Sequence, residues 1–117
     1  QYGIAPEVIA AIILIESGGD AYAISTSGAT GLMQIMPRDG VASTFNCVSG
    51  PCFADRPLTV ELLDPKFNIN FGSKLLASYI SYYGDLREGL FHYGPAGYGY
   101  EGYADIVLRL AEHIKNK

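Results

Sequence analysis

The sequence predicts an all-α fold, or nearly so, from its length, its composition and the helical spacing of its apolar residues. The chain has 117 residues, the usual size of one domain. Hydrophobic residues make up 49% and charged residues 17%, which is the balance of a globular protein. Apolar residues recur at three- and four-residue intervals, whereas no stretch alternates convincingly with the period of two that a half-buried strand shows. Since neither a repeat nor a linker is evident, one domain is expected over residues 1–117.

The first helix is expected to begin at Pro6, which suits a first helical turn. Residues 8–15 follow without a polar face, as in a helix buried on all sides. Gly18 and Gly19 then end the helix. A buried strand is the alternative because β-branched residues are frequent, but Pro6, Glu7 and the two alanines favour the helix.

The middle of the chain is expected to be largely irregular. Residues 20–31 are rich in Ser, Thr, Gly and Ala, which indicates a loop. Residues 31–36 are predicted to form one or two helical turns that end before the following proline. Another short helix is expected within residues 38–45, then a loop over residues 46–57 and at most one helical turn over residues 58–63.

A long amphipathic helix is predicted from Asp64, as N-cap, and Pro65, as first helical residue, to Gly84. Residues at four-residue spacing define its apolar stripe: Phe67, Phe71, Leu75, Tyr79 and Tyr83.

Two further helices complete the prediction. Residues 85–88 resemble a capping box that opens a brief helix through Phe91. After a Gly- and Tyr-rich loop over residues 94–102, the last helix is expected over residues 103–117, with its apolar residues on one side.

The charge of the chain excludes some classes of partner. A net charge of −4 argues against nucleic acid, which needs clustered cations, and gives no general attraction to anionic membranes or wall polymers. The longest apolar run, residues 8–15, is far shorter than the about 20 residues of a membrane-spanning helix. Neither a signal peptide nor an initiator Met is evident, so Gln1 is interpreted as the start of a processed chain or excised domain. Binding should therefore depend on a shaped site.

Cys47 and Cys52 are separated by four residues, which is not a C-x-x-C redox or zinc pattern. Together with the distant His92 and His113 they make a poor ligand set, so neither a metal nor another cofactor is expected. A disulfide that clamps a short loop and a pair of free thiols both remain open. The disulfide would favour an oxidising compartment.

Glu16 is the first candidate for chemistry. It lies in the last turn of the predicted buried helix, where burial and the negative end of the helix dipole would both raise its pKa toward that of a general acid. The alternative is a glutamate that simply leaves the core and becomes solvated. The loop after it, from Ser25 to Gln34, offers hydroxyl, backbone and amide groups that suit sugar hydroxyls and N-acetyl groups, although an ordinary turn would look the same.

Four segments in order resemble one family. Residues 16–20 are E-S-G-G-D, and residues 25–37 follow S-x-x-G-A-x-G-L-M-Q-I-M-P; both are similar to the signature of the soluble lytic transglycosylase domain. Residues 68–72, N-I-x-x-G, are similar to that family's third motif, and residues 103–107, Y-x-x-x-V, to its last. Each motif is weak alone, but their order and spacing are specific.

The resemblance implies a lysozyme-like helical domain with a groove for the glycan strands of peptidoglycan. It implies that Glu16 is the catalytic acid and base, that Ser25, Met33 and Gln34 contact glycan, and that Tyr103 borders the catalytic glutamate. It also implies a packing role for Gly72, which would justify an interior glycine that costs a helix about 1 kcal/mol relative to alanine.

One segment departs from the family pattern. The family usually has Ala-Tyr-Asn-Ala-Gly-Pro where this chain has Phe91, His92, Tyr93, Gly94 and Pro95. The family's Asn is expected to help hold an N-acetyl group of the substrate. His92 could donate a similar hydrogen bond with a different reach, or it could be a groove-wall residue without a catalytic part. The departure concerns fine specificity more than the reaction.

Glycosidases normally use two carboxylates, but the resemblance implies a reaction with one. Glu16 would cleave the β-1,4 bond between N-acetylmuramic acid and N-acetylglucosamine, and the muramyl C6 hydroxyl would close a 1,6-anhydro ring. The alternatives are a hydrolytic muramidase in which Asp20 or another acid activates water, an inactive glycan-binding module, and a helical interaction domain whose motifs match by chance. A monomeric domain, alone or within a larger protein, is expected in the periplasm, outside the cell or in the envelope, including secretion systems and virions.

Overall fold

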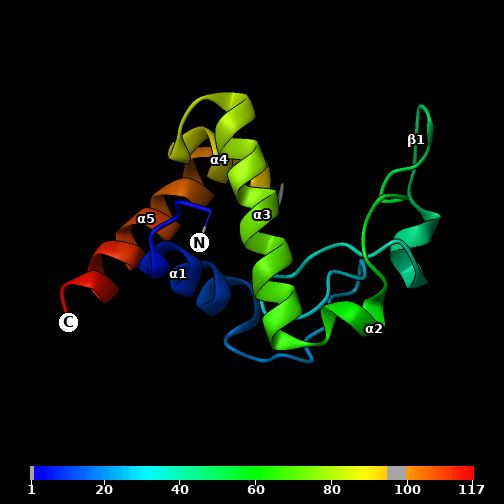
Figure 1. The fold of residues 1–117 in the computed structure, drawn as a ribbon, viewed down its shortest axis with the longest axis horizontal. Coiled ribbons are helices and arrows are strands. Elements are labelled where there is room, and N and C mark those ends of the chain that lie inside the picture. The colour runs from blue at the N-terminus through cyan, green and yellow to red at the C-terminus, as the bar shows by residue number, and fades with distance from the viewer. Residues whose placement is uncertain (1, 95–99) are drawn as a thin grey trace. The chain divides into compact units, whose positions relative to one another are not determined.

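The structure, a computed structural model, describes residues 2–94 and 100–117. Most of these residues are helical, and the prediction of a nearly all-α fold is confirmed (Figure 1). The elements in chain order are α1 (Pro6–Ser17), the 3-10 helix η1 (Gly40–Thr44), β1 (Asn46–Cys47), β2 (Gly50–Pro51), α2 (Thr59–Leu62), α3 (Pro65–Tyr83), α4 (Leu86–Tyr93) and α5 (Tyr100–Lys115). Over the described residues, none of the helices combines the length and apolar character needed to cross a membrane.

The described residues form two compact units. The helical unit consists of Gln1–Ile15 and Phe71–Lys117, and the loop unit of Glu16–Asn70. Each unit contains its own buried side chains. Those of the helical unit include one polar residue, Ser73, and are otherwise apolar: Ile4, Val8, Ala11, Ile12, Leu76, Leu90, Tyr103, Ala104, Val107 and Ala111. Those of the loop unit include two polar residues: Thr30, Leu32, Met33, Ile35, Ala42, Leu62 and Asn68.

Small residues let the helices of the helical unit approach closely. A Cβ atom on Gly89 of α4 would lie 3.0 Å from the backbone nitrogen of Ile80 in α3. A Cβ atom on Gly94 would collide with the ring of Tyr103 in α5. Tyr103 is therefore packed over the end of α4 and is only 1% exposed.

The helix ends follow the predicted capping signals. The Oδ1 atom of Asp64 accepts hydrogen bonds from the first-turn N–H groups of Lys66 at 2.9 Å and Phe67 at 3.2 Å. Asp85 caps α4 by accepting from the N–H of Glu88 at 2.8 Å. Helix α4 continues two residues beyond the predicted end, and α5 begins at Tyr100, before the predicted start. Residues 95–99 of the predicted loop lie outside the described residues.

Helix α1 has the predicted bounds but is not buried on all sides. Val8, Ala11 and Ile12 are buried, whereas Leu14 is 51% exposed. An unbroken apolar run does not fix which side of a helix faces the core, because periodicity alone cannot distinguish its faces. The buried side is set by packing.

The prediction of helical turns over residues 31–36 is wrong. Thr30 and Ile35 instead form a β-bridge, with N–H to carbonyl distances of 2.9 and 3.1 Å, and Thr30 also bridges to Ile24. Gly31 and Gln34 have φ angles of +79° and +52°, which a right-handed helix cannot contain. Two left-handed residues therefore turn the chain back on itself where apolar spacing suggested a helix.

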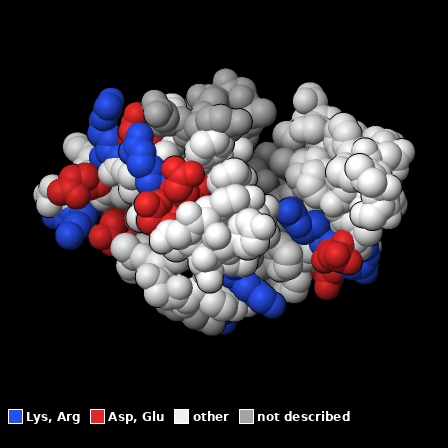
Figure 2. Space-filling model, turned by 90° about the horizontal axis from the view of Figure 1, so that it is seen from above, with Lys and Arg blue, Asp and Glu red and all other residues white. Residues whose placement is uncertain are grey.

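Residues 46–57 contain a small antiparallel hairpin rather than only a loop. Strands β1 and β2 pair Asn46 with Pro51 and Cys47 with Gly50. Cys47 and Cys52 form a disulfide, so the first of the two predicted alternatives is confirmed. Residues 45–53 include no charged side chain, and the space-filling view shows a broad uncharged surface on the side of the hairpin (Figure 2).

Candidate functional site

Glu16 is the next-to-last residue of α1 and is half-buried. Its last helical turn contains no basic residue. The chain leaves the helix at once through Gly18 and Gly19, and the N–H of Asp20 bonds to the carbonyl of Ser17 at 3.2 Å. A helix C-terminus exposes unpaired carbonyl oxygens and is the negative end of the helix dipole, so it disfavours a negatively charged side chain. Glu16 therefore lies at the negative end of the α1 dipole.

Four other carboxylates of the described residues hold backbone turns or helix ends. Asp20, the predicted alternative base, is exposed, and its Oδ1 accepts from the N–H of Tyr22 at 2.9 Å. Glu61 accepts from the N–H of Leu58 at 2.9 Å, while Asp64 and Asp85 cap helices. These contacts are local and structural.

Among the described acids, three are half-buried rather than exposed: Glu7, Glu16 and Asp39. Glu7 lies in the first turn of α1, where the helix dipole stabilises a carboxylate. Asp39 accepts at Oδ1 from both the N–H and the hydroxyl of Thr59, each at 2.8 Å. The backbone hydrogen bond from Thr59, followed by its hydroxyl, lowers the pKa of Asp39. The contacts from Thr59 favour the charged form of Asp39, which does not suit a proton donor.

The predicted sugar-binding segment forms a compact structure, called here the motif loop (residues 23–35). Ser25 Oγ accepts from the N–H of Ala29 at 3.0 Å and lies 3.3 Å from the hydroxyl of Ser27. Thr30 Oγ1 donates to the carbonyl of Gly28 at 2.8 Å. The loop thus presents neutral hydroxyls that its own backbone orients, which is the chemistry a sugar needs.

Gln34 is braced by its own side chain. Its Nε2 donates to the carbonyls of Ala23 at 3.0 Å and Gly31 at 3.1 Å. Because both partners accept hydrogen bonds, the amide nitrogen must face them and Oε1 must point the other way. No hydrogen bond reaches that Oε1 from the described residues. A left-handed glutamine costs about 1–3 kcal/mol, a strain that is concentrated at functional sites.

Asn68 opens the third family motif, but sequence reasoning assigned no role to its side chain. It is fully buried in the first turns of α3, where its Oδ1 accepts from the N–H of Met33 at 2.8 Å. Its Nδ2 donates to the carbonyls of Thr30 and Leu62, both at 2.9 Å. A Cβ atom on Gly31 would overlap that amide. Asn68 thereby fixes the motif loop from the start of α3; an amide within an apolar helix stripe was the available signal.

The loop unit brings three predicted glycan contacts onto one loop. Ser25 and Gln34 are half-buried, whereas Met33 is fully buried and is anchored through its backbone N–H by Asn68. A glycan contact by Met33 stays a prediction, as do the contacts by Ser25 and Gln34. Gly72, the predicted packing residue, is buried in α3.

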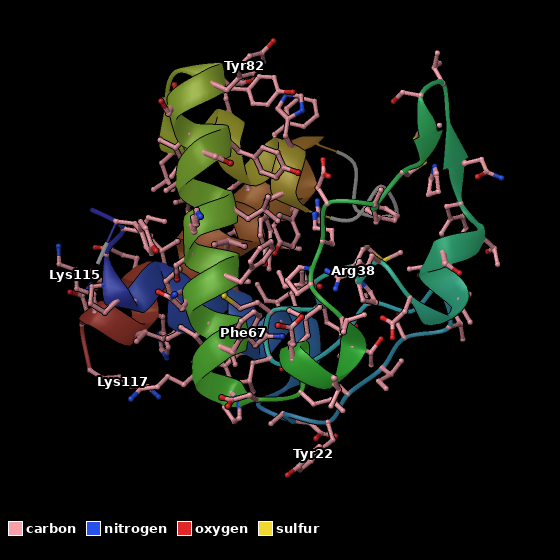
Figure 3. All side chains as sticks on the ribbon, turned by 45° about the vertical axis from the view of Figure 1, so that its right-hand side comes forward. Tyr22, Arg38, Phe67, Tyr82, Lys115 and Lys117 are labelled. Carbon is pink, nitrogen blue, oxygen red and sulfur yellow. A yellow bond between two sulfur atoms is a disulfide. The ribbon has the colours of Figure 1, made fainter. Side chains whose placement is uncertain are left out.

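His92 and Tyr103 belong to the helical unit. The exposed His92 is stacked on the ring of Tyr83, with 3.5 Å between centroids and 7° between planes, and on Phe91 at 4.5 Å and 5°. Tyr82, labelled in Figure 3 at the end of α3, meets Tyr83 edge-on and is 81% exposed. The two neighbouring rings fix the plane of the imidazole, so its nitrogens point along that plane.

Residues 1–99 match the family described as the transglycosylase SLT domain. The chain is similar to the endo-type membrane-bound lytic murein transglycosylase A of Klebsiella pneumoniae subsp. pneumoniae, with 37% identity over 76 residues, 65% of this chain and 36% of the relative. The homologous protein of Citrobacter koseri gives the same figures. The membrane-bound lytic murein transglycosylase E of Buchnera aphidicola is 40% identical over 82 residues, 70% of this chain and 34% of the relative.

The mainly helical fold and the ordered motifs place the chain in the lysozyme-like class. The family match covers most of the sequence and includes the segments that carry Glu16, the motif loop and Asn68. The chain belongs to the transglycosylase SLT domain family, and the resemblance drawn from the four motifs is confirmed. It spans about a third of the length of the curated relatives that it matches.

Proposed function

We propose that this chain is a peptidoglycan lytic transglycosylase domain in which Glu16 is the single acid and base. The observation that carries the proposal is the placement of Glu16. It is a half-buried carboxyl group at the C-terminal end of a helix, whereas the half-buried Asp39 is held in its charged form by Thr59. Asp20, which would activate water in a hydrolase, is exposed and committed to a turn. These facts favour a one-acid reaction over hydrolysis.

The reaction has two proton transfers. Protonated Glu16 gives its proton to the glycosidic oxygen between N-acetylmuramic acid and N-acetylglucosamine, and that bond breaks as the N-acetylglucosamine hydroxyl leaves. The substrate's N-acetyl group or the groove supports the positive charge at the anomeric carbon. The carboxylate of Glu16 then takes the proton of the muramyl C6 hydroxyl as its oxygen bonds to the anomeric carbon. Glu16 ends protonated, the product is a 1,6-anhydro sugar, and no water is consumed.

The substrate contacts in this proposal are neutral hydrogen bonds. Ser25 and Gln34 offer a hydroxyl and an outward amide oxygen from a rigid loop, which suits sugar hydroxyls and N-acetyl N–H groups. Met33 would contribute apolar contact, His92 a ring nitrogen for an N-acetyl group, and Tyr103 a border to the catalytic glutamate. Preorganised donors and acceptors of this kind lose little entropy on binding.

We also propose that the two units make one catalytic domain over residues 1–117 and that it acts at the cell envelope. The family match runs through both units, which supports a single domain. The relatives are named as membrane-bound murein transglycosylases, which supports action on peptidoglycan at the envelope. The Cys47–Cys52 disulfide agrees with an oxidising compartment.

The test is digestion of purified peptidoglycan by the wild-type chain and by Glu16→Gln, with mass spectrometry of the soluble products. We expect 1,6-anhydromuramyl products from the wild type and none from the variant, because glutamine cannot donate and regain the proton. Glu7→Gln is the matched control, since it changes the other glutamate of α1 and should retain turnover. Asp20→Asn should also remain active. Reducing-end products would show a hydrolase, binding without soluble products would show an inactive module, and turnover by Glu16→Gln would refute the assignment.

A further inference from the structure

Two arginines, Arg38 and Arg56, are tied to the end of the segment that carries the motif loop. The Nη1 atom of Arg38 donates to the carbonyl of Arg56 at 2.9 Å, and its backbone N–H donates to the carbonyl of Pro57 at 3.0 Å. The Nη1 atom of Arg56 makes a longer contact of 3.4 Å to the carbonyl of Met36. The guanidinium group of Arg56 therefore contacts the backbone just after the motif loop, and that of Arg38 holds the backbone of Arg56 (Arg38 is labelled in Figure 3).

Neither arginine forms an ion pair with any of the described residues. Among the described residues, a salt bridge is observed between Arg87 and Asp105. Asp39 follows Arg38 in the sequence, but its Oδ1 accepts two hydrogen bonds from Thr59. The charge of Arg38 acts on the neighbouring Asp39 and contributes to lowering its pKa, but no carboxylate of the described residues contacts either guanidinium group.

The two guanidinium groups are held in place and keep most of their donors available. A guanidinium carries five N–H groups, and the contact that each arginine makes to a backbone carbonyl uses one of them. The guanidinium carbon of Arg56 also lies 5.3 Å from the centroid of the Phe53 ring, a distance at which a cation is attracted to the ring. Arg38 is exposed and Arg56 half-buried. A guanidinium group that is held in place and keeps free N–H donors suits a carboxylate, which accepts two parallel hydrogen bonds from it.

We propose that Arg38 and Arg56 bind a carboxylate of the peptide stems that peptidoglycan carries on its muramic acid residues. This inference rests on the proposed function. The sugar backbone offers neutral groups, for which the motif loop has neutral partners, whereas the negative charges of the polymer lie on the stems. A cationic pair at the end of the motif loop would make the domain prefer strands that still carry their peptides.

The experiment compares three substrates with the wild-type chain: glycan strands with intact stems, the same strands freed of peptides by an amidase and then amidated at the lactyl carboxylates that the amidase exposes, and intact strands whose stem carboxylates have been amidated. We expect kcat/KM to be about tenfold higher for the intact strands than for the other two, the size of one charge-assisted hydrogen bond. This preference should shrink as the salt concentration rises. Because it needs no variant, the comparison does not depend on how well a mutant folds.

The double variant Arg38→Gln with Arg56→Gln should lose the preference while cleaving stripped strands at the wild-type rate. The double variant Arg38→Lys with Arg56→Lys keeps both charges without the planar guanidinium groups, and it should retain part of the preference for intact strands. Arg109→Gln, an exposed arginine of α5, is the control and should behave as wild type. Equal cleavage of all three substrates by the wild type, or an equal loss on all three by the glutamine variant, would overturn the inference. Failure of the wild type to cleave any strand would instead overturn the proposed function.

Discussion

Asn68 offers the sharpest test of how the motif loop is held. The variant Asn68→Ala removes three buried hydrogen bonds, of 2.8, 2.9 and 2.9 Å, in one step. It also leaves the N–H of Met33 and the carbonyls of Thr30 and Leu62 without this partner, and all three residues are fully buried. The variant therefore loses the bonds; the carbonyl of Thr30 still accepts from the N–H of Ile35 at 3.1 Å, so the cost of stranded polar groups falls on the other two.

The magnitude follows from the number of bonds. A buried hydrogen bond contributes about 1 kcal/mol net, and a stranded partner costs about 1–3 kcal/mol. The loss of three hydrogen bonds, with the cost of their stranded partners partly relieved by relaxation, predicts a decrease of about 3–5 kcal/mol in the free energy of unfolding. Since domains of this size have about 5–15 kcal/mol in total, the melting temperature should fall by roughly 10–20 °C.

The assay is urea unfolding at pH 7 with the disulfide intact, supported by calorimetry. Asn70→Ala is the matched control, because Asn70 is an exposed asparagine two residues further along α3. Its change should stay within about 0.5 kcal/mol. A loss below about 1 kcal/mol for Asn68→Ala would refute the reasoning, since it would mean that water or a small shift replaces all three bonds.

Asn68→Asp tests the polarity of the same contacts. The new carboxyl keeps the shape of the amide but places an oxygen opposite the carbonyls of Thr30 and Leu62. The folded state should therefore favour the protonated form and raise the pKa of this group above its unfolded value of about 3.9. A raised folded pKa means that stability is retained below the unfolded value and lost as pH rises through the folded one. Unfolding curves from pH 3 to 8 should show this loss beyond that of the wild type; a pH-independent difference would contradict it.

Two further changes probe the same unit. Gly31→Ala adds a Cβ atom 2.5 Å from the carbonyl oxygen of Leu62 at a φ of +79°, so it should destabilise the fold by several kcal/mol. The control is Gly84→Ala, at a φ of +108° with open space around it, which should cost only about 1–2 kcal/mol. Equal losses of the two variants in urea unfolding would show that the close approach to Leu62 does not matter. Asp39→Asn removes a carboxylate whose pKa is lowered by Thr59, so its contribution is present above the ordinary aspartate pKa and lost as pH falls through the folded value. The variant should be less stable than wild type at pH 7 by up to about 1 kcal/mol, and the difference should shrink at pH 3, which unfolding at both pH values can check.

The elements that the sequence predicted well are those with local signals. Helix α3 begins and ends where its capping aspartate and terminal glycine indicated, because these signals act within one turn. Asp85 likewise caps α4 as the capping pattern suggested. The long helix, its cap and the fold class therefore depend on interactions between near neighbours in the sequence.

The motif loop was mispredicted because distant residues determine it. The apolar run from Leu32 to Met36 resembles a helical turn, but Asn68, 35 residues beyond Met33, takes the N–H of Met33. Gln34 must also adopt a left-handed backbone, which no local preference of glutamine favours. The two-residue strands of the hairpin were missed for a different reason, since they are too short for any alternation to be visible.

The candidate residues were found by motif, but the sequence could not say how they are held. Gln34 was expected to contact glycan, and the structure adds that its Nε2 is committed to two carbonyls, which leaves only Oε1 for a ligand. A glutamate in its place would face those carbonyls with oxygen and would release the loop. The amide at position 34 is therefore required by the loop itself, whatever it binds.

The same physical requirement explains why the loop unit relies on amide side chains. A short loop with few backbone bridges can be rigid only if its remaining N–H and carbonyl groups find partners, since buried unpaired groups are costly. Asn68 and Gln34 supply both a donor and an acceptor without charge, and together they engage the carbonyls of Ala23, Thr30 and Gly31. A loop held in this way is ordered by its own neutral contacts, so in the proposed function it would bind a neutral sugar without reorganising first.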